Sequence, residues 1–433
     1  MDYIYMDNFR GFEDTVIPLR QVNFLVGENS TGKTSVLALL HLLNNPDFWF
    51  RQEFNYEQFE FGGYSDIVSA GAQDKSEFRI GICRCPEEGK KDSPYCVLMH
   101  FREKEGLPSI YKFAMAEKDW VGAMVSDRNL VKYRIDKLDT VCTNRQDPGC
   151  FLRCVERYAR DVSSGFKKVP SKMMSHLGMR NMWQVPEELK TLANDKSSGH
   201  STGFSLPPFT YEIVALAPIR TKPKRTYDGY ARPFSPEGEH TPHILRRVLT
   251  SRSRKAEGFR KILDDFGKAS GLFQHVGIRR FGKEQPGPFE INITLGNQPL
   301  RINSVGYGVS QVLPVVVELI DRPRRTWFSI QQPEIHLHPR AQAELGEVLY
   351  DVALHGNNTL YVETHSDYLI DRFRYSLSKS KKKIPTQIMY FENLKGQNNI
   401  TVIPIHESGK YPIDQPASFR SFFINESIRN LEI

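Results

Sequence analysis

The first third of the chain combines two patterns of apolar positions. Residues 1–26 alternate apolar and polar positions on both sides of a turn-like stretch at 8–12, which predicts an antiparallel strand pair followed by a strand. Residues 36–43 are apolar nearly all round, which indicates a buried helix. Short strand-like runs separated by turn residues follow at 78–82, 95–99 and 110–113. They predict a β-meander packed beside the sheet of the first segment.

The segment 117–210 has the weakest pattern in the chain. Helical spacing is clear at 150–161, whereas residues 194–205 are rich in Ser and Gly and indicate a mobile loop. We therefore predict an inserted, largely helical region at 117–210. It divides the domain into an amino-terminal half, 1–116, and a carboxyl-terminal half, 211–433.

Regular patterns return after residue 211. An apolar helical stretch at 312–320 separates the buried strand-like runs 213–216 and 327–330, and a further run at 360–363 also ends in polar residues. Strands that end in polar residues and are separated by a helix are typical of the carboxyl edge of a parallel sheet. The pattern predicts an α/β fold with a mixed sheet, to which residues 289–300 add a strand pair.

Residues 27–35 connect the strand that ends at residue 26 to the helix at 36–43, and they match G-x-x-x-x-G-K-[ST] at every fixed position. The two glycines let the backbone wrap a phosphate, while successive N–H groups and the helix N-terminus supply positive potential. Lys33 is expected to reach the β/γ-phosphates, and the Thr34 hydroxyl is expected to bind Mg²⁺. We predict that the loop binds a nucleotide through Asn29, Ser30, Thr31, Gly32, Lys33, Thr34 and Ser35.

Composition narrows the class of protein. With 433 residues, 39% hydrophobic and 25% charged, the chain is typical of a soluble globular protein of two or three domains. No apolar run approaches the ~20 residues of a membrane helix. Residues 1–3 read as a strand rather than a signal peptide, and six cysteines in so long a chain form no disulfide framework. We therefore expect a cytoplasmic protein without membrane contact.

The net charge of +7 leaves two interpretations open. One is an acidic partner such as DNA, and the other is that the charge serves only nucleotide phosphates and solubility. Charge alone does not decide between them. The basic positions that would form such a surface are Lys222, Lys224, Arg225, Arg252, Arg254 and Lys255.

With these motifs in view, the chain resembles the ABC-type P-loop ATPases of the SMC-like branch. It looks closest to small bacterial ATPases related to the overcoming-lysogenization-defect proteins. The resemblance covers both ends of the chain and rests on four ordered motifs besides the phosphate loop, at 8–12, 216–220, 305–314 and 333–339. It implies an ABC-type nucleotide-binding domain whose cofactors are ATP and Mg²⁺.

In that family two protomers face each other head to tail with two ATP molecules between them. The resemblance implies that Lys33 and Thr34 of one subunit face Gly308, Ser310 and Gln311 of the other. A helix N-terminus aimed at the γ-phosphate offers N–H donors that only ATP engages fully, so closure becomes a nucleotide switch. His365 matches the histidine that contacts the γ-phosphate in the family.

The chain departs from the family at the end of its acidic strand. Family members have two carboxylates there, or a carboxylate followed by Gln, whereas this sequence has Gln331 and Gln332. Gln331 occupies the metal-side position and Gln332 the position that orients the attacking water. An amide can position water, but it carries no charge and is a poor base. Either the protein hydrolyses ATP poorly, or glutamines were introduced here deliberately to trap ATP. Glu334, beyond Pro333, is expected to point elsewhere.

Two other groups of residues suggest metal sites only weakly. His336 and His338 stand two positions apart in a turn and match the dimer-contact loop of the family, so structural or cross-subunit contacts are the better interpretation. The six cysteines lack zinc-finger spacing.

The leading hypothesis is an ATPase that dimerises with ATP and controls a companion effector in bacterial anti-phage defence or DNA maintenance. Its relatives often sit beside nuclease or toxin genes, as in Septu, PARIS and retron-associated systems. The alternatives are a non-hydrolysing ATP-bound scaffold that sequesters an effector and a DNA-repair-type SMC-like ATPase. A nuclease domain of its own is disfavoured, because the segment after His365 is short and lacks a D-x-D type acidic cluster. The expected assembly is a homodimer or a larger homo-oligomer.

Overall fold

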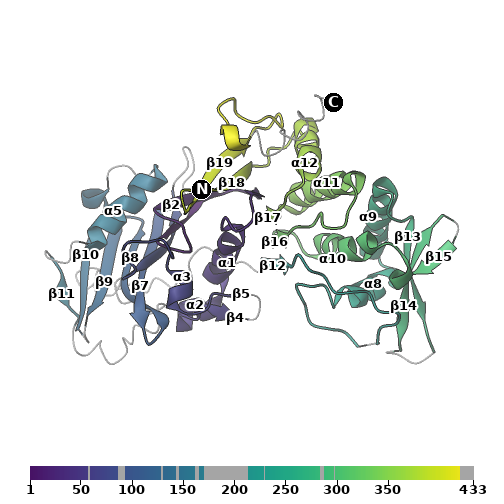
Figure 1. The fold of residues 1–433 in the computed structure, drawn as a ribbon, viewed down its shortest axis with the longest axis horizontal. Helices are drawn as coiled ribbons and strands as arrows, with labels where there is room; N and C mark the ends of the chain where they lie inside the picture. The colour runs from purple at the N-terminus through teal and green to yellow at the C-terminus, as the bar shows by residue number, and fades with distance from the viewer. Residues whose placement is uncertain are drawn as a thin grey trace. The chain divides into compact units, whose positions relative to one another are not determined.

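The computed structural model describes residues 1–56, 59–85, 93–127, 130–142, 146–160, 165–169, 213–228, 230–282, 287–296 and 298–419. The chain divides into two compact units (Figure 1). Unit 1 comprises Met1–Arg20, Glu28–Thr210 and Phe391–Ile400, and unit 2 comprises Gln21–Gly27, Tyr211–Tyr390 and Thr401–Ile433. The loop predicted at 194–205 lies outside the described residues. Within the ranges given above, no helix is long and apolar enough to cross a membrane.

Unit 1 is built on an antiparallel sheet with the strand order β11-β10-β9-β8-β7-β6-β1-β2. The predicted hairpin and β-meander are therefore confirmed. The strands are β1 (Asp2–Asp7), β2 (Thr15–Leu19), β6 (Phe78–Arg84), β7 (Tyr95–Lys104), β8 (Leu107–Glu117), β9 (Trp120–Asp127), β10 (Leu130–Lys137) and β11 (Lys167–Lys168). Further elements of this unit are α1 (Lys33–Asn44), α2 (Pro46–Arg51), β4 (Asn55–Tyr56), β5 (Phe59–Glu60) and α3 (Tyr64–Ile67).

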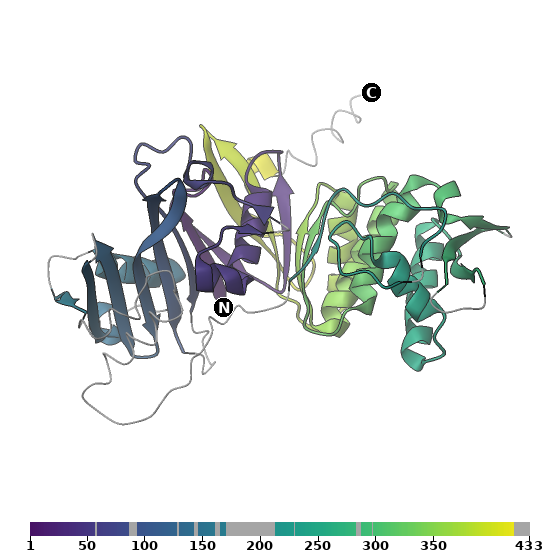
Figure 2. The same ribbon diagram turned by 90° about the horizontal axis from the view of Figure 1, so that it is seen from below.

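The described part of the segment 117–210 differs from the largely helical region that we predicted. It begins with strands β9 and β10, because residues 121–125 form a short, continuous apolar run that is buried in the sheet. Two helices follow, α4 (Leu138–Val141) and α5 (Pro148–Arg160). Figures 1 and 2 show α5 lying across one face of the meander, where it packs on β7, β8 and β9.

Unit 2 contains a second sheet with the order β12-β16-β17-β3-β18-β19, in which β12, β16, β17 and β3 run parallel. The predicted α/β class is confirmed. The strands are β3 (Val22–Gly27), β12 (Ile213–Leu216), β16 (Trp327–Gln331), β17 (Thr359–Glu363), β18 (Thr386–Leu394) and β19 (Gln397–Ile405). An antiparallel three-stranded sheet adds β13 (His275–Arg280), β14 (Phe289–Leu295) and β15 (Gln298–Arg301), which confirms the strand pair predicted at 289–300.

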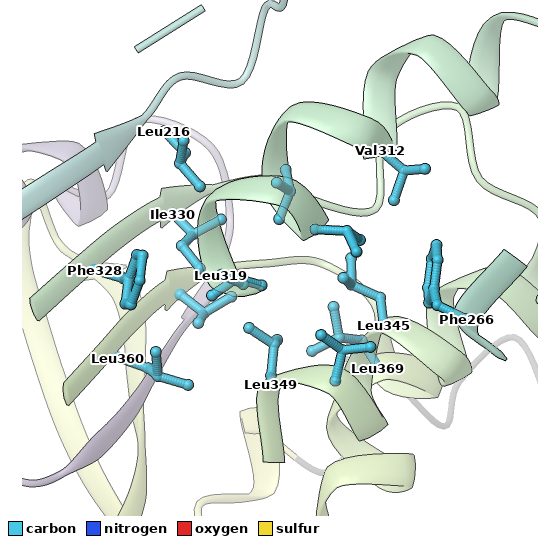
Figure 3. Close-up of a cluster of buried hydrophobic side chains, with 14 of the residues drawn as sticks. Leu216, Phe266, Val312, Leu319, Phe328, Ile330, Leu345, Leu349, Leu360 and Leu369 are labelled. Carbon is cyan, nitrogen blue, oxygen red and sulfur yellow. The ribbon is translucent and has the colours of Figure 1, made fainter. Parts of the chain in front are cut away.

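The core of unit 2 lies between the parallel strands and the helices that follow them. Figure 3 shows Phe328 and Leu360 of the sheet facing Leu319 of α10 and Leu345 and Leu349 of α11. All five side chains are buried. The helices are α8 (Thr241–Leu249), α9 (Arg254–Ser270), α10 (Tyr307–Asp321), α11 (Pro339–Gly356) and α12 (Asp367–Lys379). The apolar packing fixes the strand ends, where the predicted site residues are found.

Candidate functional site

The phosphate loop of unit 1 leads into the first turn of α1. Gly32 precedes the helix at φ 92°, and a Cβ atom there would lie 2.4 Å from Cζ of Phe12. Both the backbone conformation and the close ring exclude a larger residue. The side chain of Lys33 is buried, and its Nζ donates a hydrogen bond of 2.6 Å to the carbonyl of Glu28. The Thr31 hydroxyl donates to the same carbonyl at 2.7 Å, so the loop folds around one backbone oxygen.

The predicted nucleotide-binding residues of this loop differ in exposure. Thr31 and Lys33 are buried, and Gly32 and Ser35 are half-buried. The residues that are open to solvent are Asn29, Ser30 and Thr34. Ser30 adopts a left-handed φ of 63°, and Gly32 repeats this sign two residues later. A backbone that alternates between right-handed and left-handed conformations can direct N–H groups into one concavity, which is the arrangement that suits a phosphate.

A second group of predicted residues lies at the N-terminus of α10 in unit 2. We expected residues 306–311 to precede the helix, but the helix begins at Tyr307. The reason is that Val309 is buried together with Val312, Leu313 and Val316, and this spacing extends the apolar face by one turn. Ser310 and Gln311 are also buried.

The N-terminus of α10 packs closely on the segment 333–339. A Cβ atom at Gly308 would lie only 2.7 Å from the backbone oxygen of His336. The rings of Tyr307 and His336 meet edge to face with centroids 4.8 Å apart. Glycine at 308 is therefore required by a close backbone approach rather than by its φ angle.

Gln331, Gln332 and His365 come together at the carboxyl edge of the parallel sheet. Gln331 is the last residue of β16 and pairs with Glu363 at the end of β17. The next residue, Gln332, turns away at φ 42°, and its N–H donates a 2.8 Å hydrogen bond to the Glu363 carbonyl. His365 is half-buried two residues after β17. The end of β3 belongs to the same edge, because the Thr364 N–H donates to the Leu25 carbonyl at 3.1 Å.

Glu334 and Arg220 belong to this edge as well. We expected Glu334 to point elsewhere, but its Oε1 accepts a 2.7 Å hydrogen bond from the His365 N–H. Burial raises the pKa of the Glu334 carboxyl above its usual value. Arg220, from the segment after β12, donates through Nη2 to the Gln331 carbonyl at 3.1 Å. From the sequence we noted Arg220 only as part of the motif at 216–220. Arg220 and Glu334 both follow parallel strands, and this position is the signal that could have identified them.

Thr34 and Gln331 are the residues predicted to bind a metal, and their oxygen atoms fit Mg²⁺ better than a softer metal. Mg²⁺ prefers oxygen ligands and is usually bound by one or two protein groups together with substrate phosphates. The Thr34 hydroxyl in unit 1 and the Gln331 amide in unit 2 each offer an oxygen without a negative charge, so at either position phosphates would have to supply the charge. The two histidines at 336 and 338 are both exposed, and His338 accepts a hydrogen bond from the Ala341 N–H at the start of α11. Among the residues with described positions, no group of three or more His, Cys, Asp or Glu could hold a metal.

A family model described as "AAA ATPase domain" matches residues 1–105 and 243–370. The two segments make up more than half of the sequence, and the chain belongs to this ATPase family. The match includes the phosphate loop, the N-terminus of α10 and the edge residues from Gln331 to His365. No curated protein matches the sequence.

Three solved structures with similar folds are SMC head domains. An Smc head bound to the C-winged helix domain of ScpA is 11% identical, with a TM-score of 0.43, and the match covers 94% of this chain and 98% of that one. The SMC head domain from Thermotoga maritima is 13% identical, with a TM-score of 0.39 and coverages of 93% and 98%. An Smc head with an extended coiled coil, bound to a ScpA domain derived from Pyrococcus furiosus, is 12% identical, with a TM-score of 0.43 and coverages of 99% and 100%.

Proposed function

We propose that this protein is an ATP-dependent switch. ATP bound by residues 27–35 promotes association of two copies through the N-terminus of α10, and the assembled state controls an effector protein. The effector would be a nuclease or a toxin in bacterial anti-phage defence or DNA maintenance. The observation that carries the proposal is the phosphate loop, in which the buried Lys33 side chain donates to the Glu28 carbonyl and Ser30 and Gly32 adopt left-handed φ angles.

The charge on the nucleotide explains why ATP would act differently from ADP. Lys33 exchanges its bond to the Glu28 carbonyl for the β/γ-phosphates, where its ammonium group compensates their charge. The γ-phosphate then faces the positive end of α10 from the partner copy, which ADP cannot engage. Mg²⁺ would be held by Thr34 and Gln331 and would neutralise phosphate charge. Association is therefore linked to the third phosphate.

Hydrolysis ends the associated state, and we propose that it is slow in this chain. Gln331 and Gln332 stand where charged groups would hold metal-bound water and orient the attacking water. Their amides can accept and donate hydrogen bonds but cannot take up a proton. A slow reaction keeps the ATP-bound assembly present for longer, which suits a switch.

The uncharged side chains of Gln331 and Gln332 also support a second candidate, a scaffold that holds its effector while ATP remains bound. The two candidates differ in their response to added ATP. The switch releases phosphate and later dissociates, whereas the scaffold stays assembled with intact ATP.

The experiment is multi-angle light scattering of the purified chain with Mg-ATP, with Mg-ADP and without nucleotide, with Lys33→Ala as the control. We expect a mass increase with ATP alone and no increase for the control. The same mass under every condition would contradict the proposal. The effector is sought by purifying the native complex with ATP or ADP, followed by mass spectrometry. An ATP-dependent partner with nuclease or toxin activity is the expected result.

A further inference from the structure

The neutral amides at the sheet edge raise the question of which group accepts a proton during hydrolysis. Two carboxylates are found at this edge. Glu363 lies within β17, pairs with Gln331 in register and is buried. Glu334 lies outside the strands, two residues beyond Gln332, where the chain has already turned.

The two oxygens of Glu334 have different surroundings. Oε1 accepts the hydrogen bond from the His365 N–H at 2.7 Å. Oε2 is buried, and no described residue provides it with a hydrogen-bond partner. The residue as a whole is 9% exposed. A buried carboxylate oxygen without a partner is costly, and such an atom calls for an explanation such as a bound polar molecule.

Arg220 presents complementary groups beside this carboxylate. Its side chain is 2% exposed, and its Nη2 is engaged by the Gln331 carbonyl. Its Nε and Nη1 are buried and lack hydrogen-bond partners among the residues whose positions are described. The guanidinium and Glu334 attract each other electrostatically. A water molecule can donate to a carboxylate oxygen and accept from a guanidinium N–H, so it matches both sets of free atoms.

The charged and polar groups that act most strongly on Glu334 favour its ionised form, whereas burial opposes ionisation and outweighs them. These groups are Arg220 from the segment after β12, the Thr364 hydroxyl after β17 and backbone N–H groups including that of His365. Burial nevertheless raises the pKa of the carboxyl, which is the direction that makes a carboxylate a better base. The titratable residues at the end of β17 and just after it are Glu363 and His365.

We propose that Glu334 is the proton acceptor for ATP hydrolysis in this chain and that Arg220 is its positioning residue. The inference rests on the proposed function, because it presumes that ATP reaches this edge. In the step, the water oxygen bonds to the γ-phosphorus. The bond from phosphorus to the β–γ bridging oxygen breaks, and its electron pair leaves with ADP. One water proton passes to Oε2 of Glu334, and the products are ADP and inorganic phosphate.

The substitution Glu334→Gln separates the chemical role from a structural one. Its amide oxygen can still accept the hydrogen bond from the His365 N–H, but the side chain cannot accept a proton. We expect single-turnover phosphate release at saturating Mg-ATP to fall by ~100-fold or more. The ATP dissociation constant, measured by calorimetry, should change by no more than about threefold, because the loss is confined to the transition state. The Lys33→Ala variant, which should not bind ATP, gives the background rate (the blank) for phosphate release.

Two outcomes would overturn the inference. In the first, the Glu334→Gln variant hydrolyses ATP as fast as the unaltered chain, whereas the Glu334→Ala variant is slow. Glu334 would then serve only to hold His365 through its hydrogen bond. The second is an unaltered chain that binds ATP but releases no phosphate above the blank. Failure to bind ATP at all would instead contradict the proposed function, so the two failures are distinguishable.

Arg220 is tested by the pH dependence of single-turnover phosphate release. Removing its charge in Arg220→Gln should raise the pKa of Glu334 and move the acidic limb of the profile to higher pH. Arg220→Lys keeps the charge and should leave the limb near its original position. A residue that served only to tie strands together would lower the rate at every pH without moving the limb. That result for Arg220→Gln would remove Arg220 from the proposal.

Discussion

The Ser310 hydroxyl donates a hydrogen bond of 2.8 Å to the Tyr307 carbonyl. The side chain is turned back into the first turn of α10 and is only 6% exposed. This bond uses the common pattern in which a serine side chain in a helix bonds to a carbonyl of the preceding turn. The position therefore accommodates a small group but not a long charged one.

For this reason we predict that Ser310→Arg abolishes ATP-dependent association. The guanidinium cannot fit the buried site and would have to leave it, which disturbs the helix N-terminus. Ser310→Ala adds no bulk and should retain most of the association. Light scattering with ATP measures both variants. Equal association of Ser310→Arg and the unaltered chain would show that this end of α10 does not take part.

Gly308 and Gly306 form a matched pair for testing the contact between α10 and the segment 333–339. A methyl group at 308 would meet the His336 backbone oxygen, whereas one at 306 would meet no atom within 4 Å. We predict that Gly308→Ala lowers the free energy of unfolding by about 1–3 kcal/mol, the usual cost of overpacking. It should also weaken ATP-dependent association, whereas Gly306→Ala should leave both nearly unchanged. Urea unfolding and light scattering check this, and similar effects of the two variants would refute the contact.

Lys33→Ala should abolish ATP binding. The compact ammonium group is the charge that offsets the β/γ-phosphates, and alanine leaves them without it. Isothermal titration calorimetry with Mg-ATP measures the loss. Lys104→Ala, at an exposed position of β7, is the control and should bind like the unaltered chain. Unchanged affinity of Lys33→Ala would remove the basis for the phosphate-loop assignment.

Gln331→Glu should increase steady-state phosphate release. The added carboxylate lies at the end of β16, where it can contribute charge near the metal and its bound water, and such contributions are worth typically ~10²-fold or more in rate. ATP affinity should change much less, because the phosphate loop makes most of the contact. The rates are compared at matched ATP occupancy. Fast turnover by the unaltered chain would show that the glutamines do not limit the reaction.

Buried histidines predict how stability depends on pH. His41 of α1 packs on the Phe59 ring, and burial lowers its pKa to about 3. The unfolded chain, with an ordinary histidine pKa of about 6.5, binds a proton that the folded chain does not. Stability is therefore present above pH 6.5 and is lost as the pH falls toward 3.

Between pH 7 and pH 5 this single group should lower the free energy of unfolding by about 2 kcal/mol. The variant His41→Leu should show a pH dependence that is smaller by this amount in urea unfolding. His100, whose pKa burial lowers to about 4, contributes equally to both proteins and cancels in the comparison. Parallel curves for the two proteins would mean that His41 is not kept neutral by burial.

Local patterns predicted the features of this chain that depend on neighbours in sequence. Alternation identified the hairpin and the meander, and the fixed spacing of glycine and lysine identified the phosphate loop. The hydrogen bonds of the candidate site join residues that are distant in sequence. Glu334 and His365 are 31 residues apart, and Arg220 and Gln331 are 111 residues apart. Only the strand order of the parallel sheet brings their ends together, and no local pattern contains that order. The short apolar run at 121–125 in β9 was present in the sequence, but a run of this length does not by itself distinguish a buried strand from a buried helix.

The strand that precedes the phosphate loop finds its partners very late in the chain. Asn23 of β3 bonds to the Leu360 carbonyl, 337 residues away, and accepts from Gln387, 364 residues away. A ribosome adds about 5–20 residues per second, so roughly 20–70 s separate the synthesis of β3 from that of its neighbours. During this time β3, which leads into the phosphate loop, has not yet paired with its neighbouring strands. The sheet behind the phosphate loop is therefore completed only after residues 359–394 have been synthesised, and a nascent chain that lacks them cannot compete for ATP or for a partner.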